Sequence, residues 1–214
     1  MYDVIVLGAT FAAAGIAERY GKRCLVIEAR AQAGYEFFGA LHFDTDEASV
    51  YPYFEKCKTL FGTSTASIER KNGAFYCLCH GGNGFCTYAA KRVIDTRCTE
   101  KASLSKTYNL LIQSDKEPDF QGVKWKKAKG EDRYLLFCPV PPSASFPEAR
   151  SIALSVIRSF SNHQKLILSA NEFDYRSIEK YRKDEKGIVY VPSKAYGTPD
   201  AAFAAGMNLK EELQ

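Results

Sequence analysis

The sequence lacks any apolar run of about 18 residues, the length that a helix needs to cross a bilayer. It also lacks a strong excess of charge, because 29 Lys and Arg stand against 25 Asp and Glu, a formal net charge of +4. No positively charged leader precedes the first apolar stretch, so we expect no membrane span and no secretory signal. The content of 46% hydrophobic and 13% aromatic residues is typical of a folded globular domain and excludes a disordered chain.

Cysteine is sparse and irregularly spaced, with seven in 214 residues, which excludes a disulfide-rich small fold and favours reduced thiols in the cytoplasm. The densest group is Cys77, Cys79, His80 and Cys86. On a strand, Cys77 and Cys79 share one face and His80 points the other way. Structural zinc sites use C-x₂-C rather than C-x-C spacing, so we interpret these residues as reduced thiols beside a hairpin and predict no metal.

A run of basic residues is nearly absent as well. The one local group is Lys124, Lys126, Lys127 and Lys129 around Trp125. We interpret it as a solvated loop or strand edge, and we expect no nucleic-acid partner.

The first forty residues carry a recognisable pattern of strand, turn, helix and strand. Asp3–Leu7 is a β-branched apolar run, typical of a buried parallel strand. The alanine-rich segment Phe11–Tyr20 predicts a helix, and Cys24–Ile27 predicts a second buried strand that ends at Glu28. This order predicts a βαβ unit with an acidic residue at the tip of its second strand.

That arrangement is suited to a dinucleotide. The turn after Gly8 brings the free amides and positive dipole of a helix N-terminus to a diphosphate. Glu28 follows Gly8 by 20 positions and would accept hydrogen bonds from a ribose diol. In the pattern G-x-G-x-x-G the chain has Gly8, Thr10 and Ala13, so threonine replaces the second glycine and its Cβ limits how closely a diphosphate approaches. Any α/β protein can open this way, but the Glu28 spacing favours a dinucleotide site.

The segments 2–10 and 24–30 resemble the opening of FAD-dependent oxidoreductases with the glutathione-reductase-like FAD-binding fold. In that family a glycine pair follows the acidic residue, and here Gly34 retains one member of the pair. The segment 89–96 is similar to the later strand that passes beside FAD, with Asp95 matching and Arg97-Cys98 in place of Thr-Gly.

The C-terminal part resembles the closing strand and helix of the same family, whose helix N-terminus points at the flavin and diphosphate. Gly187–Pro192 predicts the strand, and the segment 201–213 predicts the helix. Thr198 is a favourable N-cap, Pro199 a favourable first helical residue, and Asp200 a first-turn acid.

The resemblance implies FAD as the cofactor and a set of cofactor-binding positions. These are Gly8, Ala9, Thr10, Phe11, Ala13, Glu28, Ala29, Arg30, Gly34, Asp95, Gly197 and Thr198. His42 follows the expected flavin-side segment and is a weak candidate for a catalytic proton donor. With no partner identifiable in the sequence, a structural histidine is favoured.

The predicted fold class is α/β, a Rossmann-like FAD-binding parallel sheet with an inserted antiparallel β region. We expect a single domain over 1–214, with a core of 1–40, 86–114 and 162–214 and a small β-rich substrate or cap region of 41–85 and 115–161. Alternating runs predict the antiparallel strands, and helical spacing predicts a helix over Glu148–Ser161. The alternating runs are Ser67–Glu69, Ala74–Cys79, Tyr108–Gln113, Val123–Lys127 and Tyr134–Val140.

The sequence therefore predicts an FAD-binding oxidoreductase that acts on a small molecule by flavin hydride or electron transfer. No second βαβ unit is evident, which argues against a reductase that also binds a nicotinamide cofactor. An alternative is a non-catalytic descendant of the fold that binds a nucleotide or a partner protein. A homo-oligomer, or a flavoprotein subunit completed by another chain, is a further expectation.

Overall fold

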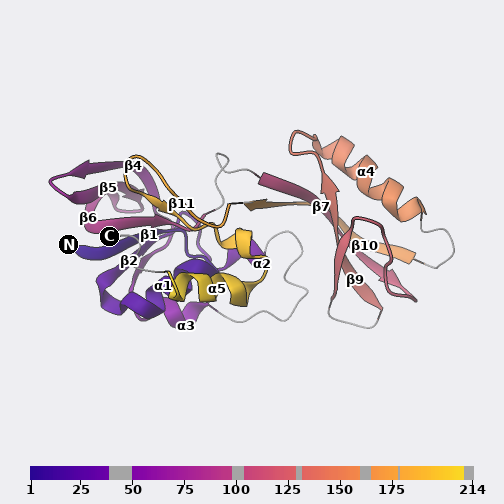
Figure 1. Ribbon diagram of the computed structural model, residues 1–214, viewed down its shortest axis with the longest axis horizontal. Helices are drawn as coiled ribbons and strands as arrows, with labels where there is room; N and C mark the ends of the chain where they lie inside the picture. The colour runs from indigo at the N-terminus through magenta and orange to yellow at the C-terminus, as the bar shows by residue number, and fades with distance from the viewer. Residues whose placement is uncertain (39–49, 98–103, 129–131, 160–164, 178, 210–214) are drawn as a thin grey trace. The chain divides into compact units, whose positions relative to one another are not determined.

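The computed structural model describes residues 1–38, 50–97, 104–128, 132–159, 165–177 and 179–209 (Figure 1). The chain divides into two units that each have their own sheet. The first comprises Met1–Glu36, Ala48–Ala102 and Glu179–Gln214, and the second comprises Phe37–Glu47 and Ser103–Ile178.

The first unit is built on a sheet whose central strands run parallel. Strand β1 (Tyr2–Leu7) pairs in parallel with both β2 (Cys24–Ile27) and β6 (Gly84–Asp95), and Val4–Leu7 is buried. In the described residues the order along the sheet is β11-β12-β6-β1-β2-β3. The outer strands are β3 (Lys58–Leu60), β11 (Arg182–Lys183) and β12 (Val189–Tyr190). The predicted strand–helix–strand unit is confirmed, with β2 spanning the residues expected.

A hairpin extends this sheet rather than forming a separate insertion. Its strands are β4 (Ser64–Lys71) and β5 (Ala74–Gly81), and β5 pairs antiparallel with the first part of β6 across the turn at Gly82-Asn83. The antiparallel pattern predicted for Ser67–Glu69 and Ala74–Cys79 is confirmed, and the hairpin belongs to the first unit because β6 is long enough to pair with both β5 and β1.

Two helices pack against each other on the first unit (Figure 1). Helix α1 (Phe11–Tyr20) buries its first seven residues, and α5 (Pro199–Met207) lies against it. A Cβ added at Gly15 would overlap the Phe203 carbonyl oxygen, and one added at Gly206 would overlap the Ala12 carbonyl oxygen. The two backbones therefore approach closely at glycine.

The short helices are η1 (Gly21–Arg23), α2 (Tyr35–Phe38), α3 (Tyr51–Phe54) and η3 (Ser193–Tyr196).

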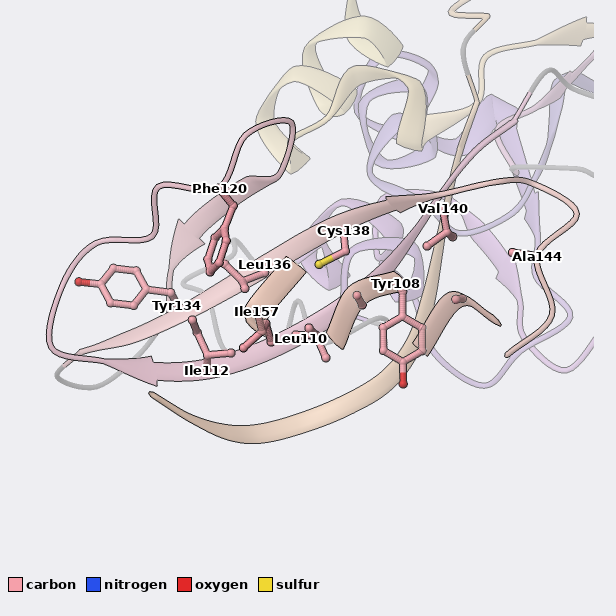
Figure 2. Close-up of a cluster of buried hydrophobic side chains, with 12 residues drawn as sticks. Tyr108, Leu110, Ile112, Phe120, Tyr134, Leu136, Cys138, Val140, Ala144 and Ile157 are labelled. Carbon is pink, nitrogen blue, oxygen red and sulfur yellow. The ribbon is translucent and has the colours of Figure 1, made fainter. Parts of the chain in front are cut away.

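The second unit is an antiparallel sheet with a helix over one face. The order is β10-β7-β9-β8, and the helix is α4 (Phe146–Ser159). Figure 2 shows Leu110, Leu136 and Ile157 among the side chains of its buried cluster, to which β7, β9 and α4 contribute. The strands are β7 (Leu104–Ser114), β8 (Lys124–Lys127), β9 (Arg133–Val140) and β10 (Lys165–Ser177).

The α/β class with an added antiparallel region is confirmed, and the boundaries between the parts differ from those expected. Strand β7 lies inside the predicted core range 86–114, yet it pairs with β9 and β10 in the second sheet. Strand β10 begins at Lys165, inside the predicted core range 162–214, and belongs to the same sheet. Among the residues described, no helix is long and apolar enough to cross a membrane.

Candidate functional site

The candidate site lies where β1 ends and α1 begins. Gly8 has a φ of +91°, a conformation that a side chain disfavours, and its N–H donates to the Ile27 carbonyl at 2.8 Å. A Cβ at Gly8 would also lie 2.6 Å from Cγ of Arg97. The predicted glycine is therefore required both by backbone conformation and by the Arg97 side chain packed over it.

Thr10 is the N-cap of α1. Its Oγ1 accepts a hydrogen bond from the Ala13 N–H at 3.1 Å and donates to Oγ1 of Thr96 at 2.8 Å. The Thr96 hydroxyl in turn donates to the Leu7 carbonyl at 2.9 Å. Thr10 thus turns inward and binds one of the first-turn amides itself, which explains physically why a β-branched residue is tolerated at the second glycine position.

Glu28 stands at the end of β2 and reaches the same turn. Its Oε2 accepts from the Ala9 N–H and its Oε1 from the Arg30 N–H, both at 2.8 Å. The residue is 7% exposed. A carboxylate has about four acceptor positions, so these two bonds fix the group without using all of its capacity.

A second carboxylate, that of Glu36 on α2, lies at the N-terminus of α1. Its Oε1 accepts from the Phe11 N–H at 2.8 Å and from the Ser193 hydroxyl at 2.8 Å. Oγ of Ser193, a fully buried residue, accepts from the Ala12 N–H at 3.3 Å. Together with Thr10, these groups give each of the three amides that follow the N-cap a protein acceptor.

The surroundings of Glu36 change its acidity. Burial raises the pKa of its carboxyl group, and this effect outweighs the hydrogen bonds from Phe11 and Ser193 and the positive charge of Lys194, which all lower the pKa. The positive end of the α1 dipole also favours the charged form. The carboxylate is therefore held by good donors in a place that is costly for a charge.

Asp95 is engaged by a neighbour in sequence. Its Oδ1 accepts from the backbone N–H of Arg97 at 3.0 Å and from Nε at 2.9 Å, and its Oδ2 accepts from Nη2 at 2.7 Å. Asp95 lies at the end of β6, opposite Leu7 of β1, so the predicted residue is at the site. Its carboxylate is turned toward the guanidinium, which also lies close enough to Glu28 to act on it electrostatically.

The remaining predicted positions fall into two groups. Three of them follow β2. The N–H of Gly34, which has a φ of +71°, donates to the Ala9 carbonyl at 2.8 Å. Ala29 and Arg30 are exposed, and the Arg30 guanidinium lies 4.2 Å from the centroid of the Tyr35 ring. Thr198 caps α5 by accepting from the Ala201 N–H at 3.3 Å, which confirms the predicted cap; Gly197 precedes it with a φ of +81°.

His42 lies outside the described residues, as do its neighbours 39–41 and 43–49. In the part of the chain that the structure describes, no group of three or more His, Cys, Asp or Glu could hold a metal ion. Cys77 and Cys79 are buried on one face of β5, and the exposed His80 packs against Phe85 in a tilted arrangement with 4.7 Å between ring centroids.

Sequence reasoning missed Glu36, Ser193, Thr96 and Arg97 as members of the site. Glu36 follows Glu28 by only eight residues, but no motif indicates that its carboxylate turns back to α1. Ser193 is 181 residues from Ala12, so only the folded chain brings the two together. Arg97 stands where the resembled family has Thr-Gly, and its positive charge two residues after Asp95 is the sequence signal for their ion pair.

Comparison with solved structures identifies the fold. The chain is similar to p-nitrophenol 4-monooxygenase PnpA from Pseudomonas putida DLL-E4, with a TM-score of 0.64 and 11% identity over 100% of this chain and 79% of that one. It is also similar to aklavinone-11 hydroxylase in a complex with FAD and aklavinone, with a TM-score of 0.58 and 12% identity over 97% of this chain. A third is the flavin-dependent monooxygenase PieE in complex with FAD and substrate, with a TM-score of 0.61 and 10% identity over 99% of this chain.

The chain spans 61% of the length of the aklavinone hydroxylase and 57% of that of PieE. No family model and no curated protein matches the sequence. These similarities show a fold shared with FAD-dependent monooxygenases and hydroxylases, and the low identities limit them to the fold.

The raised pKa of Glu36 predicts a stability change with pH. Because the folded state holds this proton more tightly than the unfolded chain, the contribution of Glu36 is most favourable below its unfolded pKa, about 4.3, and is lost as pH rises through the folded value. We expect Glu36→Gln, which does not titrate, to gain stability relative to the natural chain as pH rises from the unfolded pKa of Glu36 through its raised folded pKa. Urea unfolding of both proteins across this range measures the difference, and a difference independent of pH would contradict the assignment.

Proposed function

We propose that this protein is an FAD-binding oxidoreductase that acts on a small molecule by flavin hydride or electron transfer. The observation that carries the proposal is the position of Glu28, whose carboxylate lies at the end of β2 beside the N-terminal turn of α1. A carboxylate at this place can accept hydrogen bonds from ribose hydroxyls, and the helix N-terminus beside it favours a diphosphate. The fold shared with monooxygenases solved as FAD complexes supports it.

The residues of the ribose side fit a dinucleotide. The unused acceptor capacity of Glu28 suits the two hydroxyls of a ribose, and its negative charge disfavours a 2′-phosphate. The turn at Gly8 and the start of α1 suit a diphosphate in position and dipole direction, although Glu36, Ser193 and Thr10 accept from the amides there. Bound FAD would supply the hydride or electron chemistry, and the chain would hold and orient it.

The first test is the effect of Glu28 on binding. We expect Glu28→Gln to weaken binding of FAD and of ADP by about 10- to 100-fold, because a hydrogen bond to a charged group contributes about 1.5–3 kcal/mol. Glu69→Gln is the matched control, since Glu69 is an exposed carboxylate on β4 paired only with Lys71 among the ion pairs described. Calorimetric titration of the purified natural chain and both variants gives the comparison.

The outcomes separate the functions. Binding of FAD that depends on Glu28 supports the proposal, and a natural chain that binds ADP but not FAD supports the non-catalytic nucleotide-binding alternative. Failure of every form to bind either compound would overturn both.

Several finer features stay part of the proposal. We place the chain in the glutathione-reductase-like branch of FAD-binding folds on its opening motif, and in the cytoplasm on its irregular cysteines. We also propose that the chain forms a homo-oligomer or is a flavoprotein subunit whose substrate-binding part is supplied by another chain. Size-exclusion chromatography with light scattering tests the oligomeric state.

A further inference from the structure

The amides at the start of α1 are the donors that a diphosphate would use, and the chain supplies them with acceptors of its own. Phe11, Ala12 and Ala13 occupy the first three helical positions after the Thr10 N-cap. Their N–H groups donate to Glu36, Ser193 and Thr10 respectively. Two of these acceptors are neutral hydroxyls, whereas Glu36 brings a carboxylate to the place where the helix dipole favours an anion.

We propose that the Glu36 carboxylate is an internal anion that closes the diphosphate subsite of the proposed dinucleotide site, so that a bound diphosphate must displace it. This rests on the proposed function, because it concerns the same site. The carboxylate and a diphosphate seek the same donor, the Phe11 N–H, and both carry negative charge. They cannot share it without strong repulsion at short distance.

The surroundings of Glu36 make its withdrawal feasible. The hydrogen bonds from the Phe11 N–H and the Ser193 hydroxyl both go to the same oxygen, Oε1, and the group is held in a place where burial disfavours its charge. Lys194 follows Ser193 in the chain, is 9% exposed, and lies close enough to act electrostatically on the Glu36 carboxyl group. With the carboxylate displaced, the positive charge of Lys194 and the α1 dipole would favour an incoming anion in the same way.

The proposed role of Glu36 differs from that of Glu28, the carboxylate on the ribose side of the site. Glu28 accepts two backbone N–H groups and retains acceptor capacity toward a sugar, so it contributes to binding. Glu36 offers a diphosphate only a competing acceptor and a like charge. The two carboxylates are therefore predicted to have opposite effects on nucleotide affinity, and this contrast provides the test.

The experiment compares the natural chain with Glu36→Gln, Glu36→Ala and Glu69→Gln, each titrated with ADP and with FAD. We expect Glu36→Gln, which keeps the shape and removes the charge, to bind both compounds about 10- to 100-fold more tightly than the natural chain. Glu36→Ala should show a gain of the same sign, and Glu69→Gln should bind like the natural chain. Hydrogen exchange provides a second measurement without any nucleotide, because the Phe11 amide should exchange faster in Glu36→Ala.

Natural-chain affinity equal to or tighter than that of Glu36→Gln would overturn the inference while leaving the proposed function standing. Unchanged protection of the Phe11 amide in Glu36→Ala would overturn it as well, since the contact would then be absent in solution. Failure of all four proteins to bind ADP or FAD would instead overturn the proposed function.

Discussion

Replacement of Gly206 by alanine should destabilise the first unit by about 3 kcal/mol or more, among the largest effects available in this chain. Gly206 lies in α5 and has ordinary helical backbone, so alanine would by propensity alone stabilise the helix by about 1 kcal/mol. The added Cβ, however, would overlap the carbonyl oxygen of Ala12, which is backbone and has no rotamer through which to move away. The helices α1 and α5 would have to separate, and the contacts along their whole interface would weaken.

Far-UV circular dichroism during urea unfolding measures the loss, and Ala204→Gly calibrates the propensity contribution. Ala204 lies on the same helix and is exposed, so its replacement should cost about 1 kcal/mol without any change in packing. Gly15→Ala should resemble Gly206→Ala, because its added Cβ would meet the Phe203 carbonyl oxygen from the opposite helix. The double variant should lose less than the sum, since one separation of the helices accommodates both methyl groups. A gain in stability for Gly206→Ala would mean that the helices are not in such close contact.

The contact between α1 and α5 also affects the candidate site, because Ala12 lies both in this contact and in the first turn of α1. Its carbonyl oxygen faces Gly206, and its N–H donates to Ser193. The first turn of α1 is thus fixed from α5 on one side and from η3 on the other. A shift of α1 would move the amides of Phe11 and Ala12 relative to Glu36, so we expect variants at Gly206 to alter nucleotide binding as well as stability.

The local elements of the first unit could be predicted because their signals are local. Helix α1 and strand β2 have the bounds expected from an alanine-rich segment and an apolar run. Thr198 and Pro199 predicted the start of α5 for the same reason, since capping and proline preferences act within one turn. The pairing partners of the strands could not be predicted in the same way, because no local signal specifies them. Nothing in the alternation of β7 distinguishes pairing with β6 from pairing with β9, so the sequence alone does not place β7 in the second sheet.

The site was predictable only in part for a related reason. Gly8 and Glu28 stand at fixed spacing in one continuous segment, and both lie at the site. The groups that occupy the first turn of α1 come from α2 and from η3, and their roles depend on which side chain turns inward. Thr10 appeared in the sequence as an obstacle to a diphosphate, and in the fold it is the helix cap. Sequence patterns give residue types at positions, whereas the hydrogen bond between the Glu36 carboxylate and the Phe11 N–H arises only in the folded chain.

In the second unit, Leu136→Ala should cost about 2–5 kcal/mol. Leu136 is fully buried on β9, where it stands opposite Leu110 of β7 and Trp125 of β8 in register. Figure 2 shows it within the cluster that includes Ile157 of α4. Truncation removes three carbons from contact with two strands and leaves a cavity that the sheet backbone prevents from closing.

The chain itself provides the probe for this prediction, because Trp125 is the only tryptophan in the sequence. Its ring packs edge-to-face on Tyr134 at 5.5 Å between centroids and lies against the same cluster, so its fluorescence reports the unfolding of this sheet. We expect the free energy of unfolding, obtained from the urea transition of Trp125 fluorescence, to fall by about 2–5 kcal/mol in Leu136→Ala and by less than about 1.5 kcal/mol in the volume-conserving Leu136→Met. Lys127→Ala, an exposed change on the neighbouring strand β8, should leave the free energy of unfolding within about 0.5 kcal/mol of the natural value. An equally small change in the free energy of unfolding for Leu136→Ala would contradict the prediction, because Leu136 could then not occupy the centre of this core. The register of β9 against β7 would have to shift by one residue, and Leu135 and Phe137 would then face α4.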